Sequence, residues 1–273
     1  MLGWRRPDVM PRASSEMSSI LEAVDRLAAR GFGYRSDGSL YFDVSRYPQY
    51  GELSHRSRIS MLRKLREEGL LGPVGPGKKR DPLDFVLWQP SAADEPAWSS
   101  LWGEGRPGWH IECSALALRE LGTTIDLHGG GTDLIFPHHE CEAAQSEAAT
   151  GEKFVRHWMH QGLVGLEGTK MSKSLGNLVF VSDVLKEWEA PALRLAILSN
   201  HYREPWEWRD EMIGEAARRL DAWRGAGTGS AGLERVRECL DNDLDTPGAV
   251  AAIDDEVAAG RRVSRAAALL GVS

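Results

Sequence analysis

The sequence predicts an α/β protein, with a mixed domain over residues 1–209 followed by a small helical bundle over residues 210–273. Before residue 200, short apolar stretches alternate with helical patterns. This order is typical of strands joined by helical crossovers, so we expect parallel strands. After residue 210 the apolar residues recur at helical spacing and the connections are short, as in a helical bundle. The 273 residues, of which 42% are hydrophobic, suffice for a sizeable core.

The first part of the chain should form two helices and a strand, separated by loops. Residues 20–30 place their apolar side chains on one helical face. A turn-prone Ser-Asp-Gly then precedes a strand candidate at residues 40–44. Residues 56–68 favour a basic helix. Glycine and proline are frequent in residues 69–79 and 88–108, and we therefore expect these two segments to be loops.

The middle of the chain alternates strands and helices. Residues 124–127 form a buried strand candidate that runs into three glycines, and residues 163–165 form another. The helices expected here cover residues 112–121, 138–150, 183–187 and 191–199. In the bundle, the helices expected cover residues 210–223, 232–240 and 247–259, with a glycine-rich break at 225–231.

Composition excludes several classes of protein. The formal net charge of −7 argues against holding nucleic acid by general positive charge. No apolar run approaches the ~20 residues needed to cross a bilayer. The sparse, odd set of three cysteines favours a reducing compartment, where a special cysteine serves a metal rather than a disulfide. We therefore expect a cytoplasmic protein with no membrane partner.

Three residues have side chains suited to zinc. Cys113 ends the stretch Gly-Trp-His-Ile-Glu-Cys, and His138 and Glu142 lie four residues apart, on one face of the expected helix. Zn²⁺ accepts thiolate, imidazole and carboxylate donors. The alternative is structural, with Cys113 as a buried small apolar residue and His138 at a helix end. The absence of a Cys-x-x-Cys pair keeps both interpretations open, and three ligands leave a tetrahedral site one short.

A loop rich in lysine and serine is suited to nucleotide phosphates. Lys170 and Lys173 lie in Lys-Met-Ser-Lys-Ser, between two glycines. Lysines on such a loop stabilise the charge that develops on a triphosphate during adenylyl transfer. A solvated basic loop is the alternative for an isolated Lys-x-x-Lys, whereas the full pentad is more specific. The glycines at 129–131 permit close approach of a ligand to the backbone, which by itself is weak evidence.

These segments together resemble the cysteinyl-tRNA synthetase family of class I and, more closely, the mycothiol cysteine ligases that share its catalytic domain. The resemblance runs from about residue 11 to the end of the chain. It implies part of a class I synthetase Rossmann-like nucleotide-binding domain, with an insertion, followed by a helical bundle. The matching segments are Lys79–Asp84, Gly105–Cys113, Gly129–Glu140 and Lys170–Ser174.

The resemblance also implies roles for individual residues. Zinc in this family recognises the substrate cysteine through its thiolate, and the corresponding ligands here are Cys113, His138 and Glu142. Trp109 would line the cysteine pocket. Lys173, beside Lys170, would contact the phosphates of ATP, which is bound with Mg²⁺. The residues that would hold the adenylate are Gly131, Thr132 and Asp133, with the backbone of Val164 at the adenine.

The implied function is ATP-dependent activation of L-cysteine as cysteinyl-adenylate, followed by ligation to an amine. The amine would be glucosaminyl-inositol, because the stretches Trp206–Trp208 and Asp243–Pro247 look more like the mycothiol ligases. Cysteinyl-tRNA synthesis is the alternative, although the acidic charge balance and the short C-terminus count against it. A non-catalytic paralogue that binds zinc and cysteine is a further alternative.

The sequence departs from the family pattern near its N-terminus. The family's catalytic domain opens with a strand that bears another zinc-ligand cysteine, followed by a His-x-Gly-His motif that binds ATP, and neither occurs here. We therefore expect that the chain lacks the N-terminal half of that domain, which an upstream coding segment or a separate chain would supply. On this interpretation the 273 residues alone show little or no cysteine activation.

Overall fold

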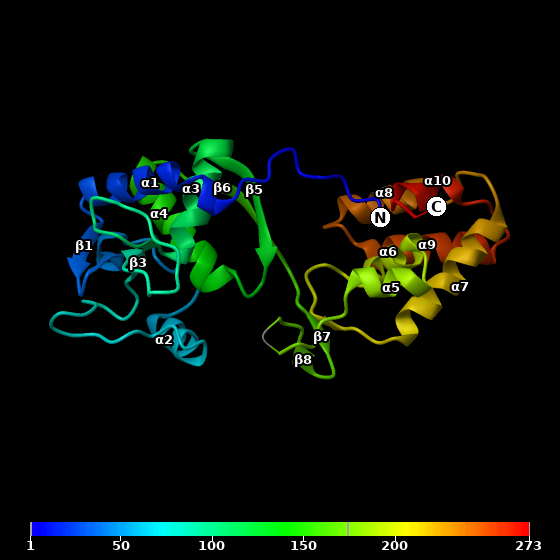
Figure 1. Cartoon of the computed structure of the whole chain (residues 1–273). Coiled ribbons are helices and arrows are strands. Elements are labelled where there is room, and N and C mark those ends of the chain that lie inside the picture. The colour runs from blue at the N-terminus through cyan, green and yellow to red at the C-terminus, as the bar shows by residue number, and fades with distance from the viewer. Residues whose placement is uncertain (1, 174, 273) are drawn as a thin grey trace. The chain divides into compact units, whose positions relative to one another are not determined.

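The computed structural model describes residues 2–173 and 175–272, which form two compact units (Figure 1). The N-terminal unit comprises Pro7–Met159. The C-terminal unit runs from His160 onward and includes the first residues of the chain, up to Arg6. The boundary expected at residue 210 therefore lies within the C-terminal unit, and the division there into a catalytic domain and a bundle stays a prediction.

The N-terminal unit combines helices with two sheets. Its helices are α1 (Met17–Ala29), α2 (Arg58–Glu67), α3 (Trp109–Leu121) and α4 (Glu140–Thr150), the last preceded by a helical turn at Ile135–His139. A four-stranded sheet contains β1 (Gly33–Ser36), β2 (Ser39–Phe42), β3 (Phe85–Gln89) and β4 (Arg106–Pro107) in that order. The strands β5 (Ile125–Gly131) and β6 (Val155–Gln161) form a separate pair.

The four-stranded sheet is antiparallel, so the expectation of parallel strands is wrong here. For β1 and β2 the local reason is the two-residue turn between them. Asp37 and Gly38 have φ values of 50° and 76°, and Ser36 pairs with Ser39 across them. Two left-handed residues form the tight turn whose twist matches an antiparallel hairpin, and so short a connection cannot join parallel strands.

The core of this unit lies between the sheet and three helices. The helices α1, α3 and α4 contact one another, and α3 also contacts β3. Phe42 stacks on Phe85 with ring centroids 4.8 Å apart. The largest fully buried side chains here are Ile20, Leu27, Leu40, Phe42, Leu87, Trp88, Ile111 and Phe136. The two site-bearing helices, α3 and α4, are therefore fixed by packing.

Asp84 ties the start of β3 to its neighbours and offers a test of this packing. Its buried carboxylate accepts hydrogen bonds from the Tyr34 hydroxyl (2.6 Å) and from the N–H groups of Val44 and Asp81 (3.0 Å each). We expect Asp84→Ala to lower the free energy of unfolding by about 3 kcal/mol or more, because three donors lose a charged acceptor. Urea unfolding monitored by tryptophan fluorescence measures the change. Exposed Asp94→Ala is the control, and an equal loss in both variants would contradict the assignment.

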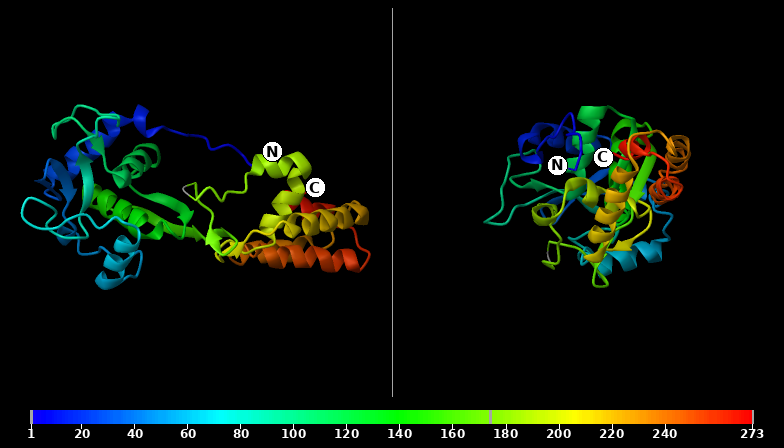
Figure 2. Two further views of the ribbon diagram at one scale, coloured as in Figure 1. Left: turned by 60° about the horizontal axis from the view of Figure 1, so that its bottom comes forward. Right: turned by 90° about the vertical axis from the view of Figure 1, so that its right-hand side faces the viewer.

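The C-terminal unit places a small sheet beside a group of helices. The sheet contains β7 (Val164–Leu166), β8 (Thr169–Lys170) and β9 (Trp206–Glu207), with β7 antiparallel to β8 and parallel to β9. The helices are α5 (Val181–Glu187), α6 (Ala190–Leu198), α7 (Glu211–Ala226), α8 (Leu233–Asp241), α9 (Thr246–Ala258) and α10 (Ser264–Leu269). Figure 2 shows the long helices α7 and α9 side by side.

The core of the C-terminal unit runs through these helices. Trp223 of α7 is buried and donates a hydrogen bond through Nε1 to Asp254 Oδ1 of α9 (2.7 Å). Among the described residues, none of the helices is both long and apolar enough to span a membrane. Other buried apolar residues are Leu193, Leu195, Ile213, Leu220, Val236, Val250 and Ile253.

Candidate functional site

The helix α3 begins where glycine allows its chain to run close against β3. A Cβ on Gly108 would lie 2.0 Å from the Val86 carbonyl oxygen, and one on Gly105 would lie 2.2 Å from the Gln89 carbonyl oxygen. Real Cβ atoms do not approach a backbone so closely, which accounts for glycine at both positions. The close approach places Trp109 and Cys113 on the first turns of α3.

The helix α4 is held on two sides by its own polar side chains. Gln145 Oε1 accepts a hydrogen bond from Ser114 Oγ of α3 (2.6 Å), and both residues are buried. The carboxylate of Glu140 accepts the N–H groups of Gly51 and Ser54, each at 2.8 Å. These contacts fix the spacing between α3 and α4. Cys113 and Glu142 therefore face each other across a rigid pair of helices.

The structure brings the three predicted zinc ligands together. The donor atoms of Cys113, His138 and Glu142 all lie within 4.8 Å of one another. His138 Nε2 lies 3.7 Å from Glu142 Oε2, and both side chains are almost fully buried. The i and i+4 spacing holds although His138 belongs to the turn before α4 and Glu142 belongs to α4 itself. One sulfur, one nitrogen and one oxygen donor therefore converge at one point.

The imidazole of His138 is oriented by two neighbours on α3. Its Nδ1 lies 2.9 Å from Nδ1 of His110, and its ring stacks on Trp109 with centroids 4.3 Å apart. Burial lowers the pKa of His110 to about 3 and that of His138 to about 4. Both rings are therefore neutral at pH 7. With Nδ1 directed at His110, Nε2 of His138 is the nitrogen directed at Glu142, as in metal ligands whose second nitrogen is hydrogen-bonded.

The carboxylate of Glu142 shows that a cation fits this cluster. Both of its oxygens are buried, and neither has a hydrogen-bond partner among the described residues. Burial alone raises its pKa to about 8, while burial and then the charge of Glu142 raise the pKa of Cys113 to about 11. A buried carboxylate without a hydrogen bond is costly. A dication at the centre of the cluster would remove that cost, and the mixed S, N and O donor set suits zinc.

Two further histidines surround Glu142, and sequence reasoning missed them. His128 Nε2 lies 3.4 Å and His139 Nε2 3.8 Å from Glu142 Oε2, and these three residues form a second group with metal-ligand spacing. A Cβ on Gly130 would lie 2.6 Å from His139 Cε1, so glycine lets β5 pass against that ring. The adjacent His-His pair was the available signal for His139, whereas His128 and His110 are brought here by tertiary packing.

The other predicted substrate contacts in the N-terminal unit lie at the end of β5 and at the start of α3. Gly131 is the last residue of β5, and its carbonyl accepts the Leu134 N–H (3.0 Å), which closes a turn containing Thr132 and Asp133. Trp109 is 52% exposed although it stacks on His138. An exposed tryptophan beside a buried histidine suits the wall of a small binding site better than a core position.

The lysine loop and Val164 belong to the C-terminal unit. Lys170 is the last residue of β8, pairs with Gly165, and is exposed, as is Lys173. The side chain of Asn177 ties the loop together, because its Oδ1 accepts the Ser172 N–H (2.9 Å) and its Nδ2 donates to the Lys170 carbonyl (3.2 Å). Ser174, the last residue of the predicted pentad, lies outside the described residues. The exposed ammonium groups leave the loop suited to phosphates.

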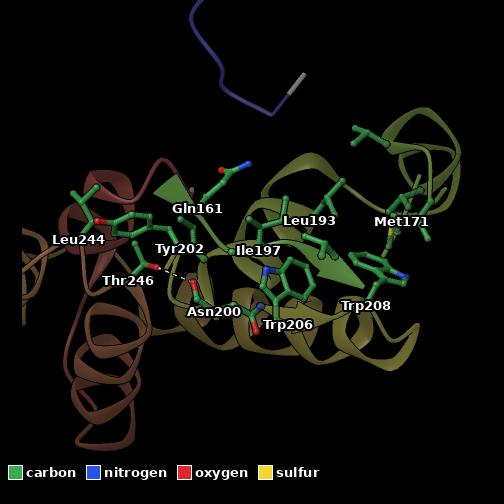
Figure 3. Close-up of a pocket in the computed structure, with 16 residues that line it drawn as sticks. Gln161, Met171, Leu193, Ile197, Asn200, Tyr202, Trp206, Trp208, Leu244 and Thr246 are labelled. Atoms are coloured by element: carbon green, nitrogen blue, oxygen red, sulfur yellow. Dashed lines mark hydrogen bonds between the residues drawn. The ribbon is translucent and has the colours of Figure 1, made fainter. Parts of the chain in front are cut away.

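Val164 is one of the residues that line an apolar pocket of about 450 Å³ in the C-terminal unit. Figure 3 shows this pocket in close-up. The Val164 carbonyl accepts the Met171 N–H (3.2 Å), so the lysine loop starts from the wall of this pocket. The walls suit an aromatic or aliphatic group rather than a phosphate, and none of the candidate zinc ligands lines the pocket. Its apolar lining residues include Met171, Leu193, Ile197, Trp206, Trp208 and Leu244, with Asn200 and Thr246 as polar ones.

Comparison with known sequences identifies relatives over nearly the whole chain. A family model for the class I (C) tRNA synthetase catalytic domain matches residues 1–218. A cysteine–tRNA ligase of Geobacter sulfurreducens is 44% identical over 285 residues, which cover 96% of this chain and 58% of that relative. One from Rhodospirillum rubrum is 47% identical over 263 residues, covering 93% and 56%. The chain therefore spans less than two thirds of the length of these relatives.

Comparison with solved structures supports the fold. A crystal structure of Mycobacterium tuberculosis methionyl-tRNA synthetase bound by methionyl-adenylate matches with a TM-score of 0.64 and 15% identity, covering 98% of this chain and 68% of the other. A second complex of that enzyme with methionyl-adenylate gives a TM-score of 0.62 at 16% identity, covering 91% and 65%. At such identities the likeness shows the fold alone, and it confirms the α/β class expected from the sequence.

Proposed function

The chain belongs to the class I tRNA synthetase catalytic-domain family, and on this premise we propose that it activates L-cysteine with ATP and transfers the cysteinyl group to an acceptor. The observation that supports the choice of cysteine is the cluster of Cys113, His138 and Glu142, whose buried oxygens accept no hydrogen bond from the described residues. A zinc ion held there would bind the thiolate of the substrate at its fourth position. The relatives named cysteine–tRNA ligase support the same amino acid.

The chain's own residues would position the reactants rather than react covalently. Trp109 would border the cysteine side chain, and Gly131, Thr132 and Asp133 would hold the adenylate. The cysteine carboxylate attacks the α-phosphate of Mg²⁺-bound ATP, and pyrophosphate leaves as cysteinyl-adenylate forms. Lys170 and Lys173, both exposed on their loop, would stabilise the charge on the phosphates in that transition state. In the second step the acceptor attacks the cysteinyl carbonyl and AMP leaves.

The acceptor that the relatives favour is tRNA, whose terminal ribose hydroxyl would form an ester. Glucosaminyl-inositol, whose amine would form an amide, is the second candidate. The sequence features favouring it are the stretches Trp206–Trp208 and Asp243–Pro247. In the structure Trp206 lines the apolar pocket, and Asp243 accepts hydrogen bonds from Arg203 and from the Tyr202 hydroxyl (2.7 Å). Because these contacts are made within the chain, the choice between the two acceptors is a question for experiment.

Cysteine-dependent exchange between ATP and pyrophosphate tests the proposal. We expect exchange with L-cysteine and at least about 100-fold less with L-serine. The reason is that zinc would bind the thiolate of cysteine, whereas the neutral hydroxyl of serine cannot replace that bond. The assay is run on the chain alone and on the chain preceded by the N-terminal segment of the Geobacter relative. A second assay offers tRNA or glucosaminyl-inositol as acceptor. Zinc and cysteine binding without exchange in either form would favour the non-catalytic alternative.

A further inference from the structure

A strongly basic segment lies within this acidic chain. Residues 56–80 contain eight basic and two acidic residues, a net charge of +6, whereas the whole chain has a net charge of −7. The segment consists of α2 and the loop that follows it, and α2 lies at the edge of the N-terminal unit (Figure 1). A positive segment in a chain of negative net charge attracts anions to one part of the surface.

The geometry of α2 places part of this charge on one exposed face. Met61 and Leu65 are buried against the unit, and at 100° per residue the opposite side of the helix carries Ile59, Arg63 and Arg66. Ile59 is 74% exposed, and both arginines are exposed. We call Ile59, Arg63 and Arg66 the α2 face. Glu67 is the acidic residue at its margin.

The arginines of the α2 face differ from four other cations of the segment, which form ion pairs. Arg58 forms a bidentate ion pair with Asp81, and Lys64 pairs with Glu68. Lys78 and Arg80 pair with Asp37 and Asp43. For Arg63 and Arg66 the described residues provide no ion-pair partner. As i and i+3 neighbours on a helix their Cβ atoms lie about 5–6 Å apart, which is close to the separation of successive phosphates along a nucleic-acid strand.

We propose that the α2 face binds the sugar-phosphate backbone of RNA, an inference that rests on tRNA as the proposed acceptor. Arginine suits phosphate because its planar guanidinium donates two parallel hydrogen bonds. A protein partner needs an apolar interface core, and Ile59 is the one apolar side chain on the face. The face has no aromatic residue on which a base would stack. Recognition here is therefore electrostatic and independent of base sequence.

The test measures binding of a fluorescein-labelled RNA hairpin of 12 base pairs by anisotropy at several salt concentrations. In Arg63→Gln/Arg66→Gln we expect the slope of log K against log salt to fall by about 2, one for each lost phosphate contact. At 0.1 M salt each lost contact weakens binding by up to about tenfold. Glu67→Gln removes the negative charge at the margin and should tighten binding. The control variant is Arg218→Gln/Arg265→Gln. It removes the same two positive charges from exposed positions of the C-terminal unit.

Each outcome decides for or against the α2 face. A loss confined to the α2 pair, with the opposite change in Glu67→Gln, supports it. An equal loss in the control pair, or no loss in the α2 pair, overturns it, and so does displacement of the hairpin by polyglutamate at equal charge concentration. Cysteine-dependent pyrophosphate exchange contains no RNA and should be unchanged in the α2 pair. A failure of cysteine activation is thereby distinguished from a failure of RNA binding.

Discussion

Replacing Cys113 by serine is expected to remove most of the zinc that the unmodified chain carries. The unmodified chain, purified without chelator, should hold about one equivalent in a single site. Serine keeps the size of the side chain but does not form an anion at neutral pH, so the S, N and O donor set loses its thiolate. Glu142→Gln should also weaken zinc binding, because it removes the charge that balances the dication. Elemental analysis after gel filtration measures both losses.

Cys239 supplies the control for this result. Cys239 lies in α8 of the C-terminal unit, so Cys239→Ser should retain zinc in full. Circular dichroism of Cys113→Ser checks that the helices remain, which separates loss of a ligand from loss of the fold. Well under half an equivalent of zinc in the unmodified chain would contradict the metal site. So would equal zinc in Cys113→Ser and Cys239→Ser.

The sequence indicated this cluster only in part, and the reason is geometric. His138 and Glu142 lie four residues apart in an expected helix, so their common face followed from helical periodicity. Cys113 is separated from them by a strand and a turn, so only its thiolate chemistry, and not periodicity, suggested that it joins them. His110 and His128 have no periodic relation to Glu142. His110 of α3 lies beside His138, and His128 of β5 lies beside Glu142. Single-sequence periodicity carries no information about such tertiary contacts.

The same limit explains which elements were missed. The helices were predicted from the periodic spacing of apolar residues. The observed bounds of α1, α2, α3, α5 and α6 agree with the expected ranges within a few residues. The strand β3 falls next to a proline-rich stretch and was not expected, and β4 and β9 contain two residues each. So short a strand is defined by its hydrogen-bonded neighbour rather than by a pattern of its own. The antiparallel direction of β1 and β2 follows from the Asp37-Gly38 turn, whereas the long loops before β3 and β4 carry no such local signal.

Lys173→Ala is expected to lower cysteine-dependent pyrophosphate exchange by about 100-fold or more, the usual cost of losing one group that stabilises transition-state charge. Lys173 is exposed on a loop that Asn177 ties to the end of β8, so its removal should leave the fold unchanged. The zinc content should also stay the same, because the proposed zinc ligands lie in the N-terminal unit. The rates are measured in whichever form of the protein shows exchange, the chain alone or the extended chain.

Lys186→Ala provides the matched control, because Lys186 is an exposed lysine of the same unit whose ammonium pairs with Asp183 on α5 (2.7 Å). If both lysines acted through general positive charge, the two variants would lose exchange equally. We expect the loss in Lys173→Ala alone, and in kcat more than in KM, because a contact that strengthens in the transition state contributes little to ground-state binding. Exchange within threefold of the unmodified rate in Lys173→Ala would show that the loop does not reach the phosphates during adenylate formation.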